Sequence, residues 1–202
     1  MKKVAVVGYG NTKFSTDDIP IESLLLESTK EVFNTTNNLS QDLIDGVIVS
    51  TNDNSKYLGA ILSELSGIKP KISHTVEHLC SSGTAAAVSA FSYIASGLAD
   101  IILVAGADKS DNPGQVLDWD RSRGEFTRPI YWASMFTKAH KRKFNTTEEE
   151  LAVVSAKNHK QALDNPHAYS HKAYTIPEIM NSKSITDDLR MLDCSYSCSV
   201  VL

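Results

Sequence analysis

One cysteine stands where a polypeptide can turn a thiol into a nucleophile. Cys80 follows an extended segment, Ile72–Leu79, and directly precedes a helical pattern over Ser81–Ser96. The first turn of a helix has unpaired backbone N–H groups and the positive end of the helix dipole, and both favour a thiolate. Small residues such as Gly83 leave room for a ligand. The pattern predicts a nucleophile at Cys80; the alternative is a small buried hydrophobic residue.

His78 is the nearest candidate for a base that could activate Cys80. In an extended segment, residues two apart point to the same face, so His78 and Cys80 could pair. We favour the interpretation that His78 packs or forms hydrogen bonds as a structural residue.

No metal site is predicted from the remaining histidines and cysteines. His167 and His171 are four residues apart, but no cysteine or acidic ligand completes a set beside them. Cys194 and Cys198 share this spacing and also lack partner ligands.

Composition excludes several classes of protein. The chain has 202 residues and a net charge of −4, with 20 basic and 24 acidic residues, which argues against a dedicated nucleic-acid binder. No apolar run approaches the roughly 20 residues of a membrane-spanning helix, so we expect no membrane partner. Three cysteines are too few for a disulfide framework, and a cytoplasmic protein is expected.

Strands and helices alternate along the first half of the chain, which is typical of a mostly parallel sheet covered by helices. Apolar runs predict strands at Val4–Val7, Gly46–Ser50, Ile72–Leu79, Ile101–Ala105 and Ser199–Leu202. Helical spacing and end signals predict helices from Pro20 to Val32, over Leu58–Leu65 and Ser81–Ser96, over Tyr131–Phe144 and from Thr147 to about Leu163. Loops are expected at Asp108–Arg128 and Tyr174–Lys183.

Several motifs, in order, resemble the thiolase superfamily, and most closely its archaeal and sterol-carrier-protein types. The nucleophile region is His78-Leu79-Cys80-Ser81-Ser82-Gly83-Thr84-Ala85-Ala86. Further segments that agree are Leu103-Val104-Ala105-Gly106-Ala107-Asp108-Lys109, Lys157-Asn158-His159, Ala162-Leu163-Asp164-Asn165-Pro166-His167-Ala168 and Asp193-Cys194-Ser195. The resemblance covers almost the whole chain. It implies an α/β fold, the thiolase-like N-terminal half: a mixed five-stranded sheet covered by helices, with an inserted loop subdomain.

The resemblance also implies the division of the chain and its chemistry. Residues 1–108 and 196–202 would form the α/β core, and residues 109–195 the inserted loop subdomain. Cys80 would accept the acyl group of acetyl-CoA or a 3-ketoacyl-CoA, with coenzyme A thioester as substrate and no further cofactor. Three residues would sit where the loop domain touches the pantetheine arm: Tyr131, Trp132 and Met135. Core packing of that subdomain is an equal alternative for these three.

A basic cluster could meet the phosphates of coenzyme A, since lysine and arginine suit phosphate groups. Its members are Lys138, His140, Lys141, Arg142 and Lys143. The favoured interpretation is a solvated helix face.

The second half of a complete thiolase has no counterpart here. Its histidine and Cys-Gly-rich motifs supply the acid/base groups, so we expect a thiolase-type acyl-CoA C-acyltransferase polypeptide that needs a partner chain. Its partners would be a second copy or a C-terminal thiolase half. The family also associates with 3-hydroxy-3-methylglutaryl-CoA synthase through a zinc/OB-fold bridging protein. The alternatives are a non-catalytic thiolase-like subunit with a structural role and, less favoured, a ketoacyl-synthase-like condensing unit.

Overall fold

The computed structural model describes residues 2–52, 55–109, 129–195 and 199–201. The chain divides into two compact units. The first consists of Met1–Asp111 with Cys198–Leu202, and the second of Asn112–Ser197. We describe each unit by itself.

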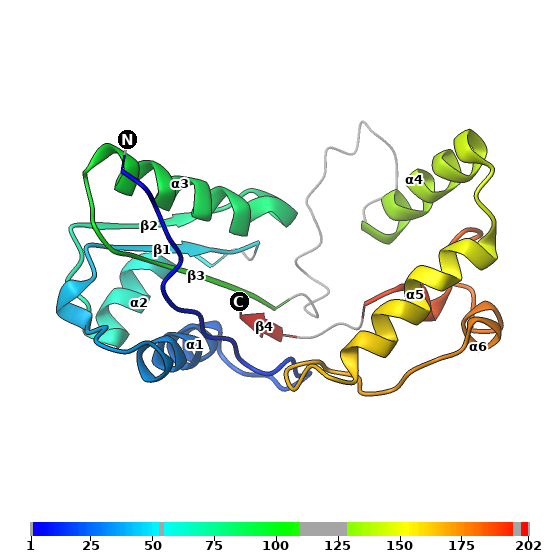
Figure 1. Cartoon of the computed structure of the whole chain (residues 1–202), viewed down its shortest axis with the longest axis horizontal. Helices are drawn as coiled ribbons and strands as arrows, with labels where there is room; N and C mark the ends of the chain where they lie inside the picture. Colours follow the sequence, from blue (N-terminus) through cyan, green and yellow to red (C-terminus); the bar gives the residue numbers. More distant parts are fainter. Residues whose placement is uncertain (1, 53–54, 110–128, 196–198, 202) are drawn as a thin grey trace. The chain divides into compact units, whose positions relative to one another are not determined.

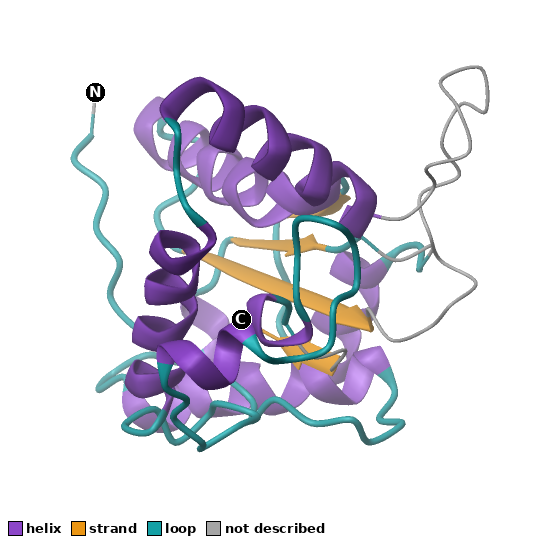
Figure 2. Cartoon of the chain, turned by 90° about the vertical axis from the view of Figure 1, so that its right-hand side faces the viewer, coloured by secondary structure: helices purple, strands orange, loops and turns teal. Residues whose placement is uncertain are grey.

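The first unit is built on a mixed sheet, drawn in orange in Figure 2. Its strands are β1 (Gly46–Ser50), β2 (Ile72–Val76), β3 (Ile102–Lys109) and β4 (Ser199–Val201), in the order β2-β1-β3-β4. β1 pairs in parallel with β2 and β3, and β4 is antiparallel to β3. All five residues of β1 are buried, as its unbroken apolar sequence predicts for a central parallel strand.

Helices cover both faces of this sheet (Figure 1). α1 (Ile21–Thr35) and α2 (Leu58–Ser66) pack on one face through Leu24, Leu25, Leu58 and Leu62, against Val47 and Val49 of β1. α3 (Ser82–Ser96) packs on the other face, where Ala86 and Ala90 meet Ile48. Gly67 and Gly97 end α2 and α3 in the left-handed conformation, with φ of +73° and +81°, as their sequence positions predict.

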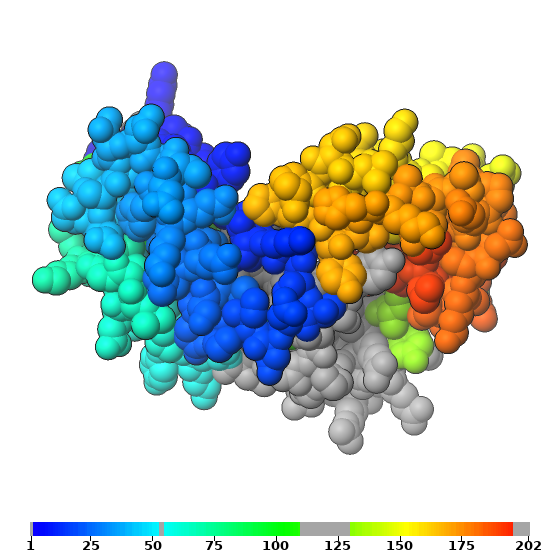
Figure 3. All heavy atoms as spheres, turned by 90° about the horizontal axis from the view of Figure 1, so that it is seen from below, coloured from blue at the N-terminus to red at the C-terminus, as the bar shows by residue number. Residues whose placement is uncertain are grey.

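The predicted strand at Val4–Val7 is wrong. These residues form no strand, and Val6 and Val7 are 93% and 68% exposed. Farther along, the segment lies against α1, where Gly10 packs on the helix backbone (Figure 3, dark blue). The central strand β1 has β2 and β3 as its neighbours, and the described sheet pairs no strand with Val4–Val7. Four strands are described instead of the expected five.

The sheet also differs from the prediction at β2, which ends at Val76 and not at Leu79, and at β3. The strand predicted at Ile101–Ala105 is formed as β3, but it continues through Gly106 to Lys109. Pairing with β4 over Ala107–Lys109 supplies the hydrogen bonds for this extension. A distant segment of the chain therefore lengthens a strand whose own apolar run has already ended.

The second unit is helical. It contains α4 (Pro129–Phe144), α5 (Glu148–Ala162) and α6 (Ile176–Met180), with a 3-10 turn at Met191–Asp193. Its core joins α5, α6 and that turn through Ala152, Ile179 and Leu192. Within the described ranges, no helix is long and apolar enough to cross a membrane.

α6 corrects the loop predicted over Tyr174–Lys183. Thr175 Oγ1 accepts from the Glu178 N–H, and Glu178 accepts from the Thr175 N–H at 2.8 Å, which is a capping box. Pro177 lies in the first turn, where a missing N–H has no cost. The same motif begins α5 at Thr147, as predicted. The spacing of Thr175 and Glu178 in the sequence is that of a capping box, and Pro177 is compatible with the helix that follows.

Candidate active site

Cys80 lies in the turn that joins β2 to α3. This turn is the 3-10 segment Leu79–Ser81, which leads directly into Ser82, the first residue of α3. Because β1, β2 and β3 are parallel, their carboxyl ends share one edge of the sheet, where open α/β sheets bind ligands. Cys80 is exposed. The alternative that it is a small buried hydrophobic residue is therefore wrong.

Side chains hold this turn by hydrogen bonds to its backbone. The Ser82 hydroxyl accepts from the His78 N–H and donates to the Leu79 carbonyl, both at 2.7 Å. The Ser81 hydroxyl donates to the His78 carbonyl at 2.8 Å. Glu77 Oε1 accepts from the Leu79 N–H at 2.6 Å. Leu79 has a φ of +52°, a left-handed conformation that bulky residues rarely adopt.

His78 does not stand beside Cys80 in the way an extended chain would place it. β2 ends at Val76, and the left-handed Leu79 turns the chain between the two side chains. Among the described residues, no hydrogen bond joins the His78 ring to Cys80. His78 serves the turn through its backbone N–H and carbonyl, which agrees with the structural interpretation favoured from sequence.

Sequence reasoning missed the part that Ser82 plays. Ser82 is 5% exposed, and its hydroxyl bonds two backbone groups. A serine at the start of a helix commonly binds free backbone groups there, and this was the available signal. Glu77 was missed as well.

The three predicted substrate contacts share one helix of the second unit. Tyr131 and Met135 are one turn apart on α4 and both are exposed, whereas Trp132 is partly buried. Cys80 belongs to the first unit. The assignment of these residues to the pantetheine arm stays a prediction.

The basic cluster of α4 has at least one member with partners inside the unit. Lys141 Nζ lies 3.4 Å from Glu148 Oε1 and 3.3 Å from Asp188 Oδ1. Lys143 lies over the Phe144 ring, with Nζ 5.1 Å from the ring centroid. Lys141 therefore braces α4 against its neighbours.

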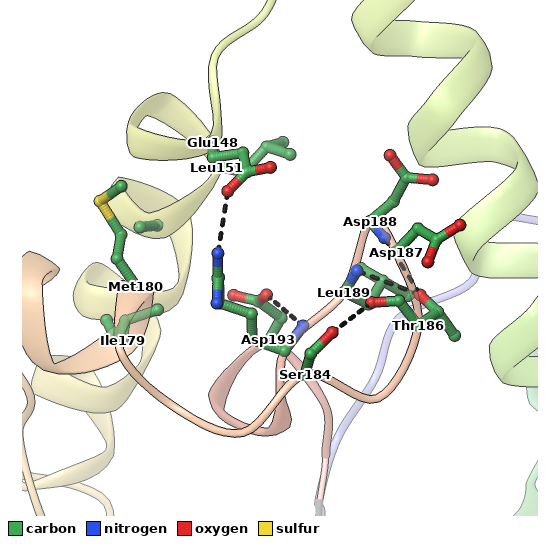
Figure 4. A pocket seen from close by; sticks show the side chains of 12 residues that line it. Glu148, Leu151, Ile179, Met180, Ser184, Thr186, Asp187, Asp188, Leu189 and Asp193 are labelled. Carbon is green, nitrogen blue, oxygen red and sulfur yellow. Dashed lines mark hydrogen bonds and ion pairs between the residues drawn. The ribbon is translucent and has the colours of Figure 1, made fainter.

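A hollow in the second unit lies between α5, α6 and the segment 184–193 (Figure 4). Arg190 spans it to Glu148 at 3.0 Å, and the Arg190 N–H donates to Asp193 at 2.9 Å. Hydrogen bonding to the Arg190 guanidinium, together with Lys141, holds the pKa of Glu148 below its ordinary value. Glu148, Arg190 and Asp193 therefore already have hydrogen-bond partners among themselves. Across the part of the chain that the structure describes, no three His, Cys, Asp or Glu side chains could hold a metal ion.

Comparison with known families identifies the family of this chain. Residues 4–189 match the family model described as the thiolase N-terminal domain. The chain belongs to the thiolase family. The match includes the turn that carries Cys80, and it confirms the resemblance predicted from the motifs around that residue.

Two curated relatives align with almost the whole of this thiolase domain. It is 30% identical over 210 residues to an acetyl-CoA acetyltransferase of Methanothermobacter thermautotrophicus, an alignment that covers 96% of this chain and 54% of the relative. It is 25% identical over 204 residues to the benzoylsuccinyl-CoA thiolase subunit BbsB of Thauera aromatica, covering 96% and 52%. The chain spans about half the length of the curated relatives named here.

A solved structure confirms the thiolase fold of the domain. The Ltp2-ChsH2(DUF35) aldolase superposes with a TM-score of 0.81, covering 98% of this chain and 54% of that chain at 22% sequence identity. At this identity the likeness concerns the fold alone. The α/β class and the thiolase-like N-terminal topology are therefore established.

Proposed function

We propose that this domain is the nucleophile-bearing half of a thiolase-type acyl-CoA C-acyltransferase, with Cys80 as the residue that accepts the acyl group. The observation that carries the proposal is the exposed position of Cys80 in a hydrogen-bonded turn at the start of α3. The unpaired N–H groups of a helix start favour negative charge on sulfur and on a developing oxyanion. Homology to acetyl-CoA acetyltransferases supports acetyl-CoA or acetoacetyl-CoA as donor.

The proposed acylation balances without a further cofactor. The Cys80 thiolate forms a bond to the thioester carbonyl carbon, and the carbonyl π pair moves to oxygen. That pair returns as the bond to coenzyme A breaks, and coenzyme A leaves as a thiolate that takes a proton. A second thioester, or coenzyme A itself, then removes the acyl group from Cys80.

A second polypeptide region is proposed to supply the acid/base groups. Among the described residues, no histidine ring is hydrogen-bonded to Cys80, and the matched relatives are about twice as long. One stripe of α3 lies away from the sheet, which packs on Ala86 and Ala90; the stripe consists of Thr84, Ala87, Val88, Phe91 and Ala95. Val88 and Phe91 in it are 59% and 46% exposed. An exposed apolar helix face of this kind supports a covering partner that corresponds to the unmatched half of the relatives.

Acylation of Cys80 tests this proposal directly. The purified chain is incubated with acetyl-CoA, alone and with a polypeptide corresponding to the second half of a relative, and peptides are analysed by mass spectrometry. We expect a 42 Da acetyl addition on the peptide that contains Cys80, and none in Cys80→Ser. Failure of acylation under both conditions would rule the proposal out.

A structural subunit is the second candidate function. The observation that favours it is the absence of a base in hydrogen-bond contact with Cys80 in the described part of the chain. In that case the domain would act by binding other chains, as a subunit of a larger thiolase complex. Copurification of a full-length thiolase-like partner that is equally active with wild type and with Cys80→Ser would select this candidate.

The proposal extends to the predicted ligand contacts and partners. Tyr131, Trp132 and Met135 would touch the pantetheine arm of coenzyme A. Homology to a subunit of benzoylsuccinyl-CoA thiolase supports a hetero-oligomer. Likeness to the Ltp2-ChsH2(DUF35) structure supports a DUF35 partner. Cosedimentation of the purified chain with a second thiolase subunit, or with a DUF35 protein, tests the two proposed partners.

A further inference from the structure

The hydroxyl of Ser82 bonds the backbone on both sides of the left-handed residue that precedes Cys80. It accepts from the His78 N–H at 2.7 Å and donates to the Leu79 carbonyl at 2.7 Å. We propose that Ser82 is a positioning residue for acyl transfer, because it turns the Leu79–Cys80 peptide so that the Cys80 N–H faces outward. This inference rests on the proposed function of Cys80.

The argument depends on the geometry of a single peptide bond. In a trans peptide the carbonyl and the N–H point in opposite directions. The Leu79 carbonyl points into the start of α3, where it accepts from both the hydroxyl and the backbone N–H of Ser82. The Cys80 N–H must then point away from α3. Among the described residues it has no acceptor, and it remains open to an incoming carbonyl oxygen.

The left-handed conformation of Leu79 shows that this orientation is imposed on the turn. A leucine rarely adopts a φ of +52°, so the surrounding bonds must hold it there. Ser82 is suited to do so, since it is 5% exposed and its hydroxyl is fixed at both ends. Ser81 differs: it is exposed, and its hydroxyl reaches only the His78 carbonyl. The matched control is Ser92, which is exposed and whose hydroxyl donates to the Val88 carbonyl within α3, away from the turn.

Comparing the rates of acyl transfer and alkylation at Cys80 distinguishes a positioning role of Ser82 from a role in folding alone. An acyl donor passes through a tetrahedral intermediate, whose oxyanion the Cys80 N–H would stabilise. The thiolate forms the S–C bond, the π pair moves to oxygen, and its return expels the leaving group with its bonding pair. Iodoacetamide reacts by displacement of iodide and forms no oxyanion. Only the first reaction needs a correctly directed N–H.

The experiment measures both reactions at Cys80 by peptide mass spectrometry. p-Nitrophenyl acetate is the acyl donor, so binding of coenzyme A is not required. We expect Ser82→Ala to lower the acylation rate by about tenfold or more while alkylation changes by less than about twofold. Ser92→Ala should change neither. If Ser82→Ala does not fold, the isosteric pair Ser82→Thr and Ser82→Val makes the same comparison of hydroxyl with methyl.

Each outcome decides the inference. Equal losses in acylation and alkylation, or no loss in either, overturn it, as does a wild-type Cys80 that p-nitrophenyl acetate fails to acylate. A selective loss of acylation in Ser82→Ala supports it. If acetyl-CoA does not acylate wild-type Cys80 but the selective loss with p-nitrophenyl acetate remains, the proposed substrate fails and the positioning role stands.

Discussion

The Asp45 carboxylate accepts a hydrogen bond from the backbone N–H of Asp100 at 2.8 Å. Its other oxygen accepts from Lys71 Nζ at 2.8 Å, and the Asp45 carbonyl accepts from the Lys71 N–H at the same distance. Asp45, Lys71 and Asp100 lie just before β1, β2 and β3 respectively. One aspartate thus ties together the starts of three parallel strands.

Removing the Asp45 charge should destabilise the first unit in a pH-dependent manner. Hydrogen bonding to Lys71, and then to the backbone N–H groups, lowers the pKa of Asp45 to about 2, below the roughly 3.9 of an unfolded chain. The ionised carboxylate therefore stabilises the fold above about pH 4, and this contribution is lost as the pH falls through about 2. Asp45→Asn should lower the melting temperature at pH 7, with a difference from wild type that shrinks toward pH 2.

Asp100→Asn is the matched control for Asp45. The Asp100 side chain pairs only with the exposed Lys2 in the described structure, and the variant keeps the backbone N–H that Asp45 binds. Its melting temperature at pH 7 should stay close to that of wild type. Equal losses in the two variants would contradict the role assigned to Asp45.

Adjacent alanines of α3 should differ in how enlargement affects stability. Ala86 is fully buried and packs near Ile48, whereas Ala87 is exposed. Ala86→Leu should cost about 1–3 kcal/mol because the added atoms have no space. Ala87→Leu should leave stability nearly unchanged. Urea denaturation followed by circular dichroism measures both, and a larger loss from Ala87→Leu would contradict the observed orientation of α3.

Two glycines near helix starts should differ in the same way. A Cβ at Gly59 would lie 2.7 Å from the His74 carbonyl oxygen, whereas a Cβ at Gly83 would meet nothing within 4 Å. Gly59→Ala should therefore destabilise the packing of α2 on β2. Gly83→Ala should stabilise the chain by about 0.4–1 kcal/mol, since it restricts the unfolded chain without strain. Thermal melts check both signs, and stabilisation by Gly59→Ala would show that α2 lies farther from β2.

The core of the second unit should depend on one isoleucine of α6. Ile179 is fully buried among residues of α5 and the 3-10 turn, so Ile179→Ala should cost about 2–5 kcal/mol. Ile185 is 45% exposed, and Ile185→Ala should cost little. Hydrogen exchange of the α5 amides reports this unit specifically. Unchanged protection of α5 in Ile179→Ala would contradict the packing.

Much of the local structure could be predicted from the order of residues. Helix ends at Gly67 and Gly97 and the capping box at Thr147 depend on backbone chemistry within a few residues. The buried strand β1 follows from its continuous apolar run. Membership in the thiolase family could also be predicted, because its motifs are short runs of residues that follow one another in order along the chain.

Other features were decided only by tertiary structure. The apolar run Val4–Val7 has the composition of a strand, but the described sheet pairs no strand with it. The stripe containing Val88 and Phe91 has helical spacing. The sheet nevertheless packs on the opposite face of α3, which has small side chains such as Ala86. Periodicity identifies an apolar face but not its partner. The turn that orients Cys80 likewise depends on Ser82 folding back onto Leu79, a contact that only the three-dimensional path of the chain creates.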